Sequence, residues 1–201
     1  MPVQKKAVRQ LQLILCGCFC LLFSSNSLVM GETSSLTFPL ILETKYTILH
    51  YRSLEDLEDF DDEIDYSEEG VFSRLFSSSD VDDLEEKVKN KVDALFRRAQ
   101  EILDMRKIMK KVIIKIHRNR EEIKRAHAEI YGTARRSSNR RVPRAWFRYK
   151  NNTAYINLDD LHEGMLAHEM AHAIIDNNLV IRPPRATAEI LARYVDTHLF
   201  D

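Results

Sequence analysis

The sequence predicts a small α+β domain in which helices alternate with short strands of a mixed sheet. Segments with apolar residues at helical spacing alternate with short segments rich in β-branched residues along residues 31–201. The chain has 201 residues, 44% hydrophobic and 30% charged, which is enough for one core but too little for two large domains. Its five glycines and five prolines exclude collagen-like and Pro-rich linker classes.

Residues 1–30 have the composition of a signal peptide. Three basic residues precede an uncharged, mostly apolar run over residues 11–23, and small polar residues follow it. A membrane-spanning helix needs about 20 apolar residues, so cleavage is favoured over an uncleaved anchor. We therefore expect an exported protein, periplasmic or secreted, with residues 31–201 as the mature domain.

All three cysteines, Cys16, Cys18 and Cys20, lie within this apolar run. We expect neither a zinc site nor a disulfide from them, because the segment is removed or held in lipid after export. Residues 15–18 resemble a bacterial lipobox, which makes a lipid anchor at Cys18 the alternative to simple cleavage. Contact with a membrane is thus expected only through the signal segment or this anchor.

The charge balance argues against a nucleic-acid partner. Loss of three basic residues with the signal segment reduces 30 Lys and Arg to 27, against 31 Asp and Glu, a net charge of −4. The basic loop over 135–144 has no interleaved aromatic residues to stack on bases. The acidic run over 55–69 overlies an apolar stripe, which favours a solvated helix face over a calcium site or an acidic tail.

The first part of the mature domain is expected to be a polar lead over residues 31–43 and a strand over 45–51. Ser53 then caps a helix whose apolar positions recur at helical spacing: Leu54, Leu57, Phe60 and Ile64.

A looser stretch over 66–79 leads into a long helix that Ser79 or Asp80 caps. Its apolar stripe consists of Val88, Val92, Leu95, Ala99 and Leu103.

A second strand is expected over 111–117, followed by a helix over 120–131 that Asn119 caps and Gly132 ends. Residues 145–150 and 153–158 then read as a hairpin.

The last two helices follow this hairpin. The first begins at Asp159 or Asp160 and runs to about Asp176, and the second covers residues 186–199 after Pro183–Pro184.

The first of these helices contains the informative motif, His168-Glu169-Met170-Ala171-His172. Positions i and i+4 of a helix share a face, so both imidazoles can bind one metal ion. Glu169 lies about 100° further around the helix, where it can hold a metal-bound water and act as its general base. Apolar flanks indicate a buried helix, in which unpaired imidazoles would be costly. Two hydrogen-bonded core histidines without a metal are the alternative.

A catalytic zinc ion normally has three protein ligands and one open position. The residues after His172 lack the glycine and third histidine of a metzincin. Glu189 on the last helix is the candidate third ligand, with a surface glutamate as the alternative reading. The string from Glu189 to Tyr194 has the form Glu-x-x-Ala-x-Tyr.

Over residues 153–201 the two helices resemble the active-site helices of gluzincin metallopeptidases, the thermolysin- and aminopeptidase-like zincins. The resemblance implies a minimal zincin-like fold with one catalytic Zn²⁺ held by His168, His172 and Glu189. Ile190 departs from the pattern, because many gluzincins have glycine directly after the glutamate ligand.

The resemblance also implies that residues 154–158 form the strand at the rim of the cleft, which pairs with an extended substrate. Tyr194 is the first candidate for the catalytic donor to the oxyanion, with Tyr155 and His198 as alternatives. Asp176 and Asp196 are candidates to orient the imidazoles.

We therefore expect an exported zinc-dependent metallopeptidase that hydrolyses a peptide or protein substrate, with Glu169 as general base. The main alternative is a non-catalytic envelope binding or scaffold protein on a zincin fold. A third hypothesis is a peptidase kept dormant by its own segment over 66–79.

Overall fold

The computed structural model of the chain describes residues 37–66, 81–132 and 142–201. Several expectations concern other residues: the signal segment with its cysteines, nearly all of the loose stretch over 66–79, the helix cap at Ser79 or Asp80, and most of the basic loop. Within the described ranges, no helix combines the length and apolarity that crossing a bilayer requires.

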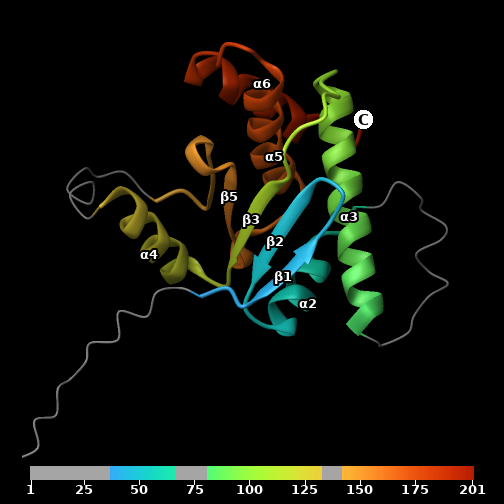
Figure 1. Cartoon of the computed structure of the whole chain (residues 1–201), viewed down its shortest axis with the longest axis vertical. Helices are drawn as coiled ribbons and strands as arrows, with labels where there is room; N and C mark the ends of the chain where they lie inside the picture. The colour runs from blue at the N-terminus through green and yellow to red at the C-terminus, as the bar shows by residue number, and fades with distance from the viewer. Residues whose placement is uncertain (1–36, 67–80, 133–141) are drawn as a thin grey trace, which may run out of the picture. The chain divides into compact units, whose positions relative to one another are not determined.

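A mixed sheet of five strands in the order β1-β2-β3-β5-β4 forms the centre of the described chain (Figure 1). The strands are β1 (Leu40–Glu43), β2 (Thr47–Tyr51), β3 (Val112–His117), β4 (Ala145–Arg148) and β5 (Thr153–Asn157). The three inner strands β2, β3 and β5 are parallel, and the outer strands β1 and β4 are antiparallel to their neighbours. With the helices around it, this sheet confirms the α+β class.

The helices flank both faces of the sheet (Figure 1). They are α2 (Leu54–Glu63), α3 (Val81–Ile102), α4 (Arg120–Tyr131), α5 (Glu163–Asn178) and α6 (Arg185–Thr197). Side chains of α2, α3, α5 and α6 share one large core with one face of the sheet. Helix α4 packs on the other face in a smaller cluster with Trp146 and Tyr155.

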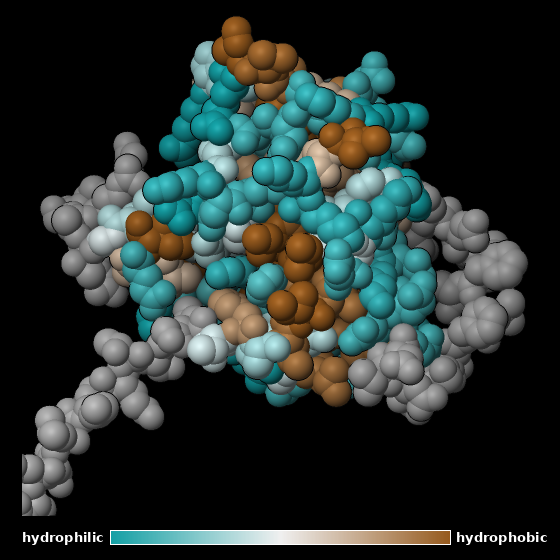
Figure 2. Space-filling model, viewed as in Figure 1, coloured by the Kyte–Doolittle hydropathy of each residue, from teal (hydrophilic) through white to brown (hydrophobic). Residues whose placement is uncertain are grey.

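The alternation of side chains along the strands explains this division. One row across the sheet faces the large core: Leu42, Leu49, Ile114, Ala154 and Phe147. The neighbouring row faces the α4 side: Ile41, His50, Lys115, Tyr155 and Trp146. Because α4 packs on β3, β4 and β5, Ile41 on β1 stays 59% exposed. Apolar side chains gather on the surface over these first strands (Figure 2).

Strand β1 corrects the expected polar lead over residues 31–43. Its residues Leu40–Glu43 pair with β2 across a tight turn in which the Thr44 N–H donates to the Thr47 carbonyl. The buried Leu42 side chain stabilises this pairing from the core side. A short apolar segment beside a proline thus gains strand structure from the backbone of its neighbour, which local pattern alone does not supply.

Two helix caps lie where the sequence predicts them. The Ser53 hydroxyl accepts from the Asp56 N–H at the start of α2. The Asn119 carboxamide oxygen accepts from Glu121 and Glu122 N–H groups at the start of α4, and Gly132 ends that helix with a positive φ of 74°.

The helix that contains His168 and His172 begins later than expected. Asp160 lies in a short 3₁₀ turn over Leu158–Asp160 and accepts a hydrogen bond from Asn157. The cap of α5 is His162, whose Nδ1 accepts from the Met165 N–H at 3.2 Å. Neither predicted aspartate therefore caps this helix, because the 3₁₀ turn and the extended residues after it delay its start.

Candidate metal centre

The two histidines of the motif lie one turn apart on α5, as the spacing predicts. Their ring centroids are 4.9 Å apart and the rings are nearly perpendicular. His172 is buried and His168 is partly buried. Most of α5 is enclosed, which confirms the buried helix expected from the apolar flanks.

Helix α6 brings Glu189 to these imidazoles. Its Oε2 lies 3.6 Å from His168 Nε2 and 3.7 Å from His172 Nε2. The other oxygen, Oε1, lies 3.7 Å from the Arg185 guanidinium one turn earlier on the same helix. Glu189 is therefore a member of a three-residue cluster, drawn from two consecutive helices that pack closely.

The cluster fits the donor set of a zinc ion. One ligand atom from each residue lies within 4.8 Å of the others. In a tetrahedral zinc site with bonds of about 2.1 Å, ligand atoms lie about 3.4 Å apart, so a small contraction suffices. Burial lowers the pKa of His168, and it lowers that of His172 to about 4. Both rings are thus neutral at pH 7, the form that binds a metal.

Glu169 lies beside the cluster in a buried position. It is only 6% exposed, and the backbone N–H of Phe147 on β4 acts on its carboxylate to lower the pKa. Its Oε2 has no hydrogen-bond partner among the described residues. Burial and the negative charge of Glu189 raise the pKa of Glu169 to about 8. A carboxyl group held near neutral pKa beside a metal cluster can accept and return a proton.

The strand order corrects the expected rim strand. Residues 154–158 coincide largely with β5, which is paired on one side with β3 and on the other with β4. The outer strand beside α5 is β4. The expectation failed because the parallel pairing of β3 with β5 joins segments separated by a whole helix, and no local pattern reveals it.

Tyr194, the expected oxyanion donor, lies five residues after Glu189, about 140° around α6. It is 48% exposed, and its ring stacks on His198 at 3.9 Å between centroids. The His198 ring is held by the Thr197 hydroxyl and the Tyr194 carbonyl. These two residues therefore form a pair on the outer part of α6, on a different face from Glu189.

The third candidate donor, Tyr155, is excluded by its position. Its ring stacks on Trp146 at 4.7 Å between centroids, on the α4 side of the sheet. Helix α5 packs on the opposite face.

The two candidate aspartates have different surroundings. Asp176 pairs with Arg182, with Nε to Oδ1 at 2.5 Å. Asp196 on α6 lies directly against the Cα of Gly164 on α5, one turn before His168, where any side chain would collide with its carboxylate. Its negative charge acts on His168. Asp196 thus lies near the cluster, as the sequence reading allowed.

Tyr149 is a neighbour of the cluster that sequence reasoning missed. Its hydroxyl lies 3.4 Å from Nδ1 of His172, the ring nitrogen that faces away from Glu189. It follows β4 in a 3₁₀ turn over Tyr149–Asn151 within the hairpin. A hairpin tyrosine carries no sequence signal for a site, because its approach to α5 depends on how the sheet packs on that helix.

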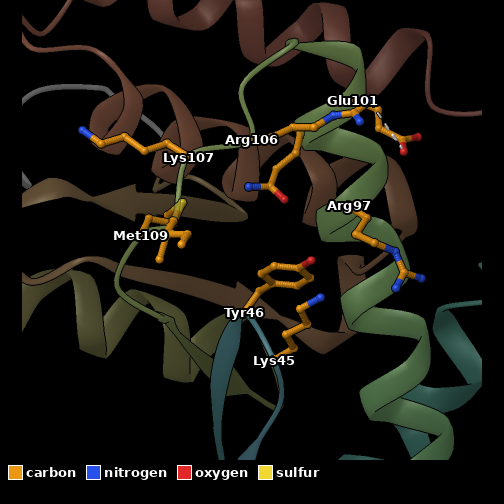
Figure 3. A pocket seen from close by; sticks show the side chains of 9 residues that line it. Lys45, Tyr46, Arg97, Glu101, Arg106, Lys107 and Met109 are labelled. Atoms are coloured by element: carbon orange, nitrogen blue, oxygen red, sulfur yellow. Dashed lines mark ion pairs between the residues drawn. The ribbon is translucent and has the colours of Figure 1, made fainter.

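A separate hollow of about 420 Å³ lies between the β1–β2 turn, the end of α3 and the loop after it (Figure 3). Its lining contains four cationic residues, Lys45, Arg97, Arg106 and Lys107, and none of the cluster residues. Lys107 extends away from the other lining side chains in Figure 3. Arg106 lies 3.9 Å from Glu101, and the Lys45 ammonium lies over the Tyr46 ring.

Comparisons of the sequence and structure with protein-family models, curated proteins and solved structures find no match.

Proposed function

We propose that the chain is a zinc-dependent metallopeptidase. The observation that carries this proposal is the convergence of His168 Nε2, His172 Nε2 and Glu189 Oε2, with distances of 3.6 and 3.7 Å from the carboxylate to the two rings. Two histidines and one glutamate are a donor set of catalytic zinc, which keeps a fourth position open. The buried Glu169 beside them distinguishes this cluster from a purely structural metal site.

The proposed site assigns separate roles in peptide hydrolysis to the zinc ion and to Glu169. Zinc supplies a Lewis acid and lowers the pKa of water at the open position. Glu169 accepts the proton of the attacking water and donates it to the leaving amine. The backbone N–H of Phe147 favours the charged form of the Glu169 carboxylate, the form that accepts the proton.

The proposed substrate is an extended peptide that pairs with the outer edge of β4. This strand ends the sheet and packs against α5, next to Glu169. An added strand gains backbone hydrogen bonds whatever its side chains are, which suits a peptidase acting on unfolded segments.

We also propose that the chain works after export, on the basis of residues 1–30. Fractionation of cells that produce the full chain tests this, with recovery of a shortened protein outside the cytoplasm as the expected result.

Metal content is the first test of the cluster. We expect about one zinc per chain. The His168→Ala and Glu189→Ala variants should lose it, because each removes one of three ligands. His50→Ala and Glu101→Ala are matched controls, since His50 lies on the α4 side of the sheet and Glu101 lines the separate hollow. Retention of zinc by Glu189→Ala would remove this three-ligand site from consideration.

The Glu169→Gln variant tests catalysis separately. It should keep zinc but hydrolyse unfolded protein substrates about 10²–10⁴-fold more slowly, because the amide cannot accept a proton. Unchanged hydrolysis by this variant would contradict the proposed base. Tight peptide binding without turnover in the unaltered chain would instead support the binding or scaffold protein.

A further inference from the structure

The hydroxyl of Tyr149 is placed to fix the orientation of one metal ligand. A histidine that binds zinc through Nε2 carries its proton on Nδ1, and a partner for that N–H sets the tautomer and the ring plane. In this chain Nδ1 of His172 lies 3.4 Å from the Tyr149 hydroxyl oxygen. The two rings meet edge to face, with centroids 6.3 Å apart.

Arg182 holds the Tyr149 ring from its other side. Its guanidinium carbon lies 4.2 Å from the ring centroid, in cation–π geometry. Tyr149 also meets Phe147 edge to face, at 5.1 Å between centroids. The ring therefore contacts three side chains, His172, Arg182 and Phe147, which restrict its position.

Asp176 fixes Arg182 in turn. The Arg182 Nε donates to Asp176 Oδ1 at 2.5 Å. Asp176 lies one turn after His172 on α5, so the contacts return to the helix from which they start. His172 and Asp176 of α5 are thus connected to each other through Tyr149 and Arg182.

We propose that Tyr149 is a positioning residue for the metal site: its hydroxyl oxygen accepts a hydrogen bond from the Nδ1–H of His172, and the Arg182–Asp176 pair holds the tyrosine in place. This inference rests on the proposed zinc site. It adds a function for the loop between α5 and α6, because Arg182 comes from that loop. The loop thereby stabilises a ligand geometry without contacting the metal.

The test is zinc affinity, measured by competition with a chelator of known affinity. Tyr149→Phe keeps the ring and its stacking but removes the hydroxyl, and we expect an affinity about 10–100-fold weaker. Tyr155→Phe is the matched control, because it removes a tyrosine hydroxyl on the other side of the sheet, and its affinity should not change.

A second variant separates positioning from folding. Arg182→Met should weaken zinc binding when Tyr149 is present. It should cause little further loss of zinc affinity in the Tyr149→Phe variant, because Arg182 acts through the Tyr149 hydroxyl. Thermal unfolding of the metal-free variants should match that of the metal-free original chain. The absorption spectrum of the cobalt(II)-substituted protein should shift in Tyr149→Phe, because the His172 ligand changes orientation.

The outcomes distinguish the two proposals. No zinc in the unaltered chain would overturn the metallopeptidase proposal itself. Zinc bound normally, with equal affinity and an equal cobalt spectrum in Tyr149→Phe, would overturn only the role of Tyr149. Additive losses in the double variant would overturn the role of Arg182 as its support.

Discussion

At the scale of single residues, His117 shows how strongly the fold resists a buried charge. It is 1% exposed at the end of β3, and neither ring nitrogen has a hydrogen-bond partner among the residues described. Burial lowers the pKa of His117 to about 4; the charge of Glu122 opposes this shift, and nearby cations reinforce it: Arg52, Lys115 and Arg125. The imidazole is therefore neutral in the folded chain at pH 7.

This pKa predicts an acid-sensitive stability. The folded pKa lies below the unfolded value near 6.5, so the unfolded chain takes up the proton first as the pH falls. The contribution of His117 to the free energy of unfolding should be fully present above about pH 6.5. It should decrease by on the order of 3 kcal/mol as the pH falls to about 4. His117→Phe should remove this part of the pH dependence, measured by urea unfolding at several pH values. Equal pH profiles for His117→Phe and the unaltered chain would contradict the assignment.

At the scale of secondary-structure elements, the contact between α5 and α6 includes a close approach at Gly164. The Asp196 carboxylate of α6 occupies the space of a side chain at this position. Alanine normally stabilises a helix interior relative to glycine by about 0.5–1 kcal/mol. Here Gly164→Ala should instead destabilise the chain by about 1 kcal/mol, because the added methyl group displaces the Asp196 carboxylate from its present position.

The double variant provides the check on this contact. In an Asp196→Ala background the collision is absent, so Gly164→Ala should be neutral or stabilising in chemical unfolding. A similar loss of stability in both backgrounds would show that the glycine is needed for another reason.

The elements also show what sequence can and cannot supply. Helices α2 and α4 were predictable because caps and apolar stripes are local signals, and the His168 to His172 pair was predictable because its geometry is set by one helix. The approach of Glu189 to the two histidines could not be deduced from the sequence, because it depends on how α6 packs on α5. Tyr149 and the outer position of β4 were beyond reach, because they depend on pairings between distant segments.

At the scale of the whole molecule, a charged network joins the helices on the two faces of the sheet. Asp56 of α2 is buried and accepts hydrogen bonds from the Arg52 N–H and the Arg118 side chain. Arg52 in turn pairs with Glu122 of α4. The acidic run is therefore only partly a solvated face, since one of its carboxylates fixes α2 to the end of β3.

Removal of Arg118 should release this connection. Arg118→Met leaves the buried Asp56 carboxylate with the backbone donor alone, and we expect a loss of about 2 kcal/mol in the free energy of unfolding. Lys124→Met is the control, because its pair with Glu121 is exposed and should contribute less than about 0.5 kcal/mol. Equal effects of the two substitutions would contradict the structural role of Arg118.

The strand order has a consequence for the sequence of events in folding. In the central strand β3, Val112 pairs with Thr47 of β2 and Ile113 pairs with Thr153 of β5. Both pairings join segments far apart in the sequence, so each closes a long loop. The β1–β2 and β4–β5 hairpins and the α5–α6 pair join neighbouring segments instead, which form faster. The three candidate zinc ligands lie within residues 168–189. We therefore expect them to come together early in folding and the pairing of β3 with its two neighbours to be slower.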